Sequence, residues 1–314
     1  MGRYIIGRIL SAIPVMGFVA LFVFLLLRLT PGDPAAILAG DAATPDQLEK
    51  IRQNLGLNDP LHIQFFTWIG KLLQGDFGTS LLSGKPVLDL VMVRLEPTIS
   101  LALTTIVLSV LIAVPLGVVA AWRQGTLIDR FVMALSVLGF SVPIFVIGYV
   151  MISIFALDLR WLPVQGFKPI GDGVGAFAER IALPTITLTL LYIALIARIT
   201  RTSMLEILGE DFVRTARAKG LPEMRVLMRH ALRNCAVPIV TVIGIGFALI
   251  ISGVVVTESV FNLPGIGRLT VDAVLARDYP VIQAVILLAS LLYVVINLLI
   301  DILYVVLDPR IRYS

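Results

Sequence analysis

Long uncharged apolar runs constrain this chain more than any other feature, because few folds can accommodate them. The hydrocarbon core of a bilayer is roughly 30 Å thick, and about 20 apolar residues cross it as a helix. Only helices and closed barrels satisfy every backbone group in lipid, and these runs lack the alternation of barrel strands. The runs with the composition of membrane-spanning helices are 9–29, 98–122, 131–157, 181–197, 236–257 and 281–307. The sequence therefore predicts an all-α integral membrane protein with six transmembrane helices.

Composition supports this prediction, because the chain is 58% hydrophobic and only 15% charged. Soluble domains carry about 25% charged residues. Proline occurs inside four of the runs, at Pro14, Pro115, Pro143 and Pro184. We expect these prolines to be tolerated within single spans, since neighbouring helices shield the carbonyl groups that they free.

The distribution of basic residues predicts the orientation of the chain, since Lys and Arg near span ends stay cytoplasmic. One side has Arg3, Arg8, Arg123, Arg130, Arg310 and Arg312 near span ends, and eight more Lys/Arg between Arg198 and Cys235. The loops of the other side are poorer for their length, with Arg160, Lys168, Arg180, Arg268 and Arg277. We expect both termini to be cytoplasmic. The net charge of +4 then reflects topology and not nucleic-acid binding.

No pattern of residues supports chemistry within this chain. The two histidines, His62 and His230, fall on opposite sides of the membrane in this topology, and the single Cys235 has no metal-ligand spacing around it. A glycine-rich stretch at 78–85 differs from a phosphate loop in its spacing and has proline where Ser or Thr would bind the metal. We expect no catalytic residues, no metal and no cofactor. The first span exceeds the usual 7–15-residue core of a signal peptide, so we expect it to be retained.

The long polar segment between the first two spans has helix signals. Thr44, Pro45 and Gln47 predict an N-cap, a first helical residue and a capping box, and the helix should stop near Gly56. A second helix is predicted after Pro60 with one apolar face, and a third over 86–95. The segment is either a packing appendage or a surface for a partner.

The polar stretch 198–235 separates two apolar runs and predicts a short amphipathic helix over 210–219. Phe212, Ala216 and Gly220 should share one face at i, i+4 spacing, and Gly220 should end the helix in a left-handed cap. Pro222 suits the start of a second helix, on which Arg225, Arg229 and Arg233 form a stripe. We expect this stripe to contact lipid phosphates.

Seven stretches spread along the chain carry a resemblance to a known family. They are LRLTPGDP (27–34), GLNDPL (56–61), GDFGTS (75–80), RTARAKGL (214–221), ESVFNLPGIGR (258–268), RDYPVIQ (277–283) and LDPRIRY (307–313). The chain resembles the first permease of ATP-binding-cassette (ABC) importers for dipeptides, oligopeptides and nickel. In such permeases a cytoplasmic E-A-A-x3-G-x9-I-x-L-P pattern docks on the ATPase. Aligned on Gly220, the alanine at Ala216 and the leucine at Leu232 match, whereas Arg214 replaces the acid and Arg233 the proline.

The resemblance implies the type I importer permease fold, with a first helix and an outer helical segment (1–94), a five-helix core (95–307) and a cytoplasmic tail (308–314). It implies a homologous second permease, two ATP-binding subunits, an extracytoplasmic solute-binding protein and surrounding membrane lipid as partners, in the inner membrane. ATP would be hydrolysed by the partners and not by this chain. The candidate coupling residues are Glu210, Arg214, Thr215, Ala216, Lys219 and Gly220.

Polar residues inside or beside the spans are candidates for the translocation pathway. Asn297 and Asp301 lie one turn apart in the last run, with Ser290 further out, and either line the pathway or make a structural hydrogen bond. Glu258 and Asp278 flank an outer loop that is either a rigid hairpin or a contact for the binding protein or released substrate.

Peptides are the cargo that the resemblance favours. Nickel chelates, glutathione, opines and oligosaccharides remain alternatives. A different class, an ATP-independent secondary transporter, predicts charges at span centres or an internal repeat, and neither is found. A membrane-embedded hydrolase lacks a nucleophile and base pair.

Overall fold

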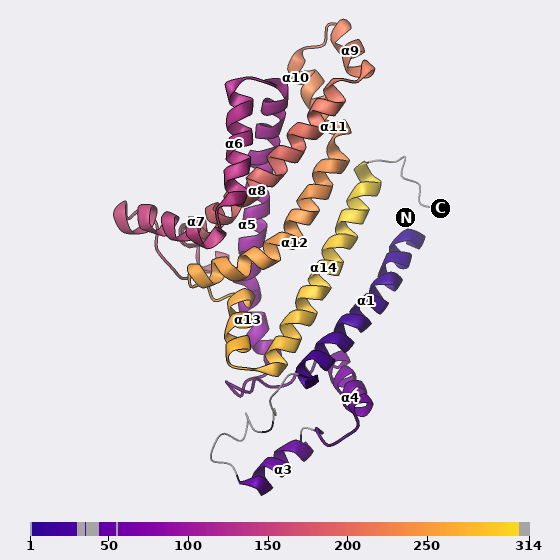
Figure 1. Cartoon of the computed structure of the whole chain (residues 1–314), viewed down its shortest axis with the longest axis vertical. Coiled ribbons are helices and arrows are strands. Elements are labelled where there is room, and N and C mark those ends of the chain that lie inside the picture. The colour runs from indigo at the N-terminus through magenta and orange to yellow at the C-terminus, as the bar shows by residue number, and fades with distance from the viewer. Residues whose placement is uncertain (1, 30–34, 36–43, 55, 308–314) are drawn as a thin grey trace. The chain divides into compact units, whose positions relative to one another are not determined.

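The computed structural model describes residues 2–29, 35, 44–54 and 56–307, and this part of the chain is helical, without strands. The longest helices are α1 (Gly2–Leu29), α5 (Val87–Trp122), α8 (Val174–Leu208), α12 (Ala236–Val260) and α14 (Tyr279–Leu307) (Figure 1). The chain forms two compact units, one of residues 1–95 and 269–294 and one of 96–268 and 295–314. Most of the 27–34 stretch and the tail 308–314, with Arg310 and Arg312, lie outside the described residues.

The first unit contains the helices α3 (Pro45–Asn54) and α4 (Leu61–Leu73), whose starts agree with the sequence signals. The capping box forms, since the Thr44 backbone N–H donates to Gln47 Oε1 at 3.0 Å and the Gln47 N–H donates to Thr44 Oγ1 at 3.4 Å. The apolar face of α4 packs against α1. The centroid of the Phe24 ring lies 5.3 Å from that of Phe65 and 5.7 Å from that of Trp68, so aromatic contacts hold α4 to α1.

The second unit is built around α8, which packs against α12 and against α6 (Leu127–Ser141) (Figure 1). Its core includes Leu188, Tyr192 and Ile196 of α8, all almost fully buried. The helices α5 and α6 can approach α8 closely because each has a glycine at the contact. A Cβ on Gly139 of α6 would lie 2.8 Å from the Ala194 Cβ, and one on Gly117 of α5 would lie 2.6 Å from the Thr200 Cβ.

The run predicted as a span over 131–157 is not one continuous helix. The structure has α6, then α7 (Ile144–Met151) and a π-helical turn (Ile152–Asp158), and the two parts meet at 104°. Pro143 is the cause, because it has no N–H to donate and forces Val142 out of the helical region, to φ −97° and ψ 123°.

Two other predicted boundaries also differ. The short helix predicted over 86–95 is the first part of α5, which continues through Pro97. The run predicted to end at residue 197 continues as helix to Leu208, so the first third of the polar stretch 198–235 extends α8. Four described helices are long and apolar enough to cross a membrane, and two bent pairs pass the same test together, which gives up to six spans.

The remaining elements are short. They are α9 (Asp211–Ala218), α10 (Glu223–Arg225), a π-helical turn (Val226–Ala231), α11 (Leu232–Asn234), a 3-10 turn (Ile170–Asp172) and α13 (Ile266–Leu275). Cys235 is fully buried between α11 and α12, as expected for a small apolar side chain at a span end.

Candidate functional site

The helix predicted in the polar stretch forms as α9, with Glu210 as its N-cap residue and Lys219 as its C-cap residue. Gly220 follows with φ +76°, and its N–H donates to the Arg217 carbonyl at 2.9 Å. Glycine adopts this left-handed conformation without a steric penalty, so it terminates the helix sharply. The next helix begins after Pro222, as the sequence predicted.

One face of α9 is buried against the chain itself. Val213 and Ala216 form a small apolar cluster with Val226 of the following π-helical turn. Phe212 and Ala216 have the predicted i, i+4 spacing but differ in exposure, since Ala216 is 6% exposed and Phe212 is 41% exposed. The sequence did not single out Val213 as the anchor. Residues at i, i+3 and at i, i+4 are both neighbours on a helix, so the spacing alone does not distinguish Val213 from Phe212 as the partner of Ala216.

The opposite face of α9 is open and polar. It carries Arg214, Thr215 and Lys219, all exposed, beside Phe212. Arg214 makes only an exposed ion pair with Asp211, at 3.4 Å. This face is available to another molecule, and Ala216 and Gly220 shape the turn beside it.

An ion pair fixes the turn that joins α9 to α10. The Arg217 guanidinium donates to both Glu223 carboxylate oxygens, at 2.7 and 3.2 Å. This bidentate hydrogen bonding raises the pKa of Arg217. The pair spans Gly220 and Pro222, so it holds the two helices at a defined angle.

A second ion pair, which the sequence did not predict, joins α6 to α8. Arg201 donates to both oxygens of Asp129, and the contact from its terminal nitrogen measures 2.8 Å. The Asp129 carboxylate also accepts the Gly125 N–H at 2.9 Å, so it orders the connection between α5 and α6. Both side chains are largely buried, with 6% and 18% exposed for Asp129 and Arg201.

Glu258 is fully buried at the C-terminal end of α12. Its carboxylate accepts hydrogen bonds from the Thr98 hydroxyl of α5 at 2.5 Å and from the Arg268 N–H at 3.0 Å. Thr98 Oγ1 in turn accepts the Ile266 N–H at 2.8 Å. Thr98 and Glu258 thus satisfy the first amide groups of α13, whose helix dipole favours an anion there. These bonds support the rigid-hairpin interpretation of the loop.

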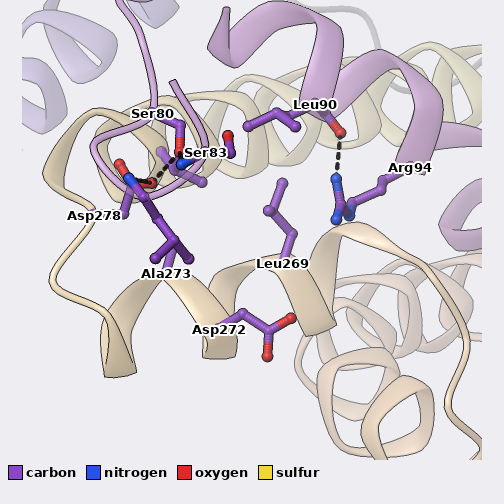
Figure 2. Close-up of a pocket in the computed structure, with 10 residues that line it drawn as sticks. Ser80, Ser83, Leu90, Arg94, Leu269, Asp272, Ala273 and Asp278 are labelled. Carbon is purple, nitrogen blue, oxygen red and sulfur yellow. Dashed lines mark hydrogen bonds between the residues drawn. The ribbon is translucent and has the colours of Figure 1, made fainter. Parts of the chain in front are cut away.

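In the first unit, the buried carboxylate of Asp278 orders a loop in the way that Glu258 does in the second unit. Its carboxylate accepts hydrogen bonds from the Ser80 hydroxyl at 2.5 Å, the Leu81 N–H at 3.0 Å and the Leu82 N–H at 3.4 Å. Figure 2 shows Ser80 and Asp278 facing each other beside a small pocket, with Arg94 at its other end donating to the Leu90 carbonyl. Asp278 is only 2% exposed, so its role within this chain is structural.

The predicted pathway residues lie on α14, one turn apart. Asn297 is exposed within this chain and Asp301 is half-buried. Nearby, the Tyr304 hydroxyl donates to Thr241 Oγ1 of α12 at 2.8 Å. Ser290 donates to the Ile286 carbonyl of its own helix, which is a structural bond. Among the described residues, no group of three His, Cys, Asp or Glu side chains is placed to hold a metal ion.

Comparison with known proteins assigns this architecture to a family. A family model described as the inner membrane component of binding-protein-dependent transport systems matches residues 113–313, and the N-terminal model of such components matches residues 1–102. A probable peptide ABC transporter permease protein of Sinorhizobium fredii is 56% identical over 100% of both chains. The glutathione transport system permease protein GsiC of Salmonella paratyphi A is 44% identical over 99% of both.

A solved structure shows the same fold at low sequence identity. A chain of the inward-facing MetNI methionine ABC transporter superposes with a TM-score of 0.59 at 18% identity, over 70% of this chain and 96% of that one. The resemblance carried by the seven sequence stretches is thereby confirmed. The chain belongs to the family of inner membrane components of binding-protein-dependent transport systems and is a multi-pass permease subunit of an ABC importer.

Proposed function

We propose that this permease passes peptides across the inner membrane, driven by ATP hydrolysis in two partner subunits. The observation that carries the substrate class is the full-length similarity to a peptide permease at 56% identity and to a glutathione permease at 44%, since glutathione is itself a tripeptide. A homologous second permease and an extracytoplasmic binding protein complete the proposed complex.

The proposed topology has six spans and cytoplasmic termini, with the broken helix α6–α7 counted as one span and α12, which follows the bend at Cys235, as another. Its segments are the first helix with the outer helices (1–94), the five-span core (95–307) and the tail (308–314). The basic residues at span ends support this orientation.

In this arrangement α9 is the coupling helix. Its exposed face, with Phe212, Arg214, Thr215 and Lys219, would bind the ATPase, while Val213 and Ala216 fix it to the permease. Ile207 and Leu208, at the end of α8, pack against the cluster of Val213, Ala216 and Val226, so motion of α9 would be transmitted to α8. The Asp129–Arg201 pair would pass this motion on from α8 to α6. Asn297 and Asp301 are proposed to line the pathway at the cytoplasmic half of α14.

Uptake by the reconstituted complex tests this function. Vesicles that contain the permease pair, both ATPases and the binding protein should accumulate a labelled dipeptide or tripeptide only when ATP is present. Excess unlabelled peptide should compete. Uptake that survives without ATP would contradict the importer mechanism, and competition by glutathione but not by other peptides would identify the narrower substrate.

A further inference from the structure

An apolar groove lies between the end of α5 and the helical segment that follows the coupling turn. It is lined entirely by apolar side chains: Val114, Pro115, Val118, Val119, Trp122, Met224, Leu227, Met228 and Leu232. Val118 and Leu227 are 5% and 2% exposed, so they form its floor, whereas Met224 and Met228 are 66% and 51% exposed. The groove has a volume of about 180 Å³.

The rim of this groove is positively charged. The Arg123 guanidinium lies over the Trp122 ring, 4.4 Å from its centroid, so a cation is held at the edge of the apolar lining. Arg225 and Arg229 are exposed and adjacent in sequence to the two methionines of the lining. The one acid between residues 221 and 234, Glu223, is paired with Arg217. Arg123 thus places a cation at the edge of the groove, and the exposed arginines of the neighbouring segment add positive charge to its surroundings.

The position of the groove relative to the membrane favours a lipid over a soluble ligand. Trp122 ends the long apolar helix α5, and tryptophan and arginine at such ends mark the level of the lipid headgroups. The floor extends from there towards the apolar part of α5, and flexible methionines adapt to an acyl chain. An apolar groove with a cation at its edge can bind both parts of an anionic phospholipid, the acyl chain in the groove and the phosphate at the cation.

We propose that this groove binds an acyl chain of an anionic phospholipid whose phosphate is held by Arg123 and Arg225. The lipid would then lie between α5 and residues 224–232, the segment that follows the coupling turn. This segment would contact the membrane, while α9 contacts the ATPase. The proposal rests on the orientation given under the proposed function, and it concerns a site that is separate from the exposed face of α9.

Lipid retention by the intact complex tests the proposal. The complex is reconstituted in mixed phosphatidylcholine and phosphatidylglycerol, extracted, and its bound lipids are counted by native mass spectrometry. Phosphatidylglycerol should be retained roughly fivefold over phosphatidylcholine. Arg123→Gln should abolish this preference, and Met228→Trp, which fills the groove from an exposed position, should reduce retention of both lipids. Arg130→Gln is the matched control, because it removes the same charge from α6, which does not line the groove.

Equal retention in the wild type, Arg123→Gln and Met228→Trp would overturn the proposal, as would an equal loss in Arg130→Gln. A photo-crosslinking residue in place of Met224 gives an independent result. It should label phospholipid, and a label on the second permease or on an ATPase would show instead that a protein covers the groove. Peptide uptake by the wild-type complex is measured in parallel, so that failure of lipid binding is distinguished from failure of transport.

Discussion

The Thr98 hydroxyl donates a 2.5 Å hydrogen bond to Glu258 Oε1 across 160 residues of sequence. Through this bond Thr98 of α5, the C-terminal end of α12 and the first turn of α13 form one hydrogen-bonded corner. The ESVFNLPGIGR stretch, a mark of the family resemblance, is therefore explained by structure. Its glutamate, proline and glycines build a tight hairpin around a buried carboxylate.

Gly265→Ala should destabilise this corner, because a Cβ at residue 265 would overlap the Glu258 carboxylate. Relief requires displacing a buried, hydrogen-bonded side chain, and we expect a loss of about 1–3 kcal/mol. Thermal unfolding of the solubilised permease measures it. Gly171→Ala is the control, since a Cβ there meets no atom within 4 Å. Equal stability of the two variants would contradict the described packing.

Asp129→Asn should destabilise the bundle, because it leaves the largely buried Arg201 without its charged partner. We expect a loss of about 2–3 kcal/mol, below the full range for buried pairs because Arg201 is still 18% exposed. Asp211→Asn breaks an exposed ion pair and should change stability by no more than about 0.5 kcal/mol. If Asp129→Asn is as mild as this control in the same unfolding assay, the Asp129–Arg201 pair is not a structural link.

Asp278→Ala should release the loop around Ser80, since the carboxylate holds one hydroxyl and two backbone amides. Hydrogen bonds to charged groups contribute about 1.5–3 kcal/mol each at most, so the loop should open locally before the helices unfold. Hydrogen exchange should increase at Leu81 and Leu82 while the middle of α8 stays protected. Asp89→Ala removes an exposed carboxylate from the first turn of α5 and serves as the control. Unchanged exchange at Leu81 would refute this role of Asp278.

Gly220→Ala should disturb the coupling turn without a steric clash, because a Cβ there meets nothing within 4 Å and only the φ of +76° opposes it. We expect a cost of about 1–2 kcal/mol. Gly209→Ala, at φ −80°, should be tolerated. The readout is binding-protein-stimulated ATP hydrolysis, which should fall in Gly220→Ala alone. Equal rates in both variants would show that the left-handed cap is dispensable.

Local features of this fold were predictable from sequence. The Thr44–Gln47 capping box and the Gly220 cap form as expected, because each depends on residues within a few positions of one another. The spans follow from apolar length. Their bends do not, since Pro14 and Pro115 lie within continuous helices whereas Pro143 breaks one.

The long-range polar links were not predictable. Glu258 and Asp278 were recognised as candidates, but their partners Thr98 and Ser80 lie 160 and 198 residues away and are single hydroxyl side chains with no pattern around them. The inward position of Ala216 was also missed, because Val226, against which it packs, belongs to a π-helical turn that ordinary helical spacing does not predict.

Retention of the ATPase by α9 variants tests the central claim most directly. Thr215→Trp places a bulky side chain on the exposed face of α9, and Gln124→Trp places the same side chain on the exposed turn before α6. The account predicts that ATPase copurifying with the tagged permease falls about tenfold in Thr215→Trp, equivalent to about 1.4 kcal/mol, and is unchanged in Gln124→Trp. Full ATPase retention and stimulation in Thr215→Trp would contradict the assignment of α9 as the coupling helix.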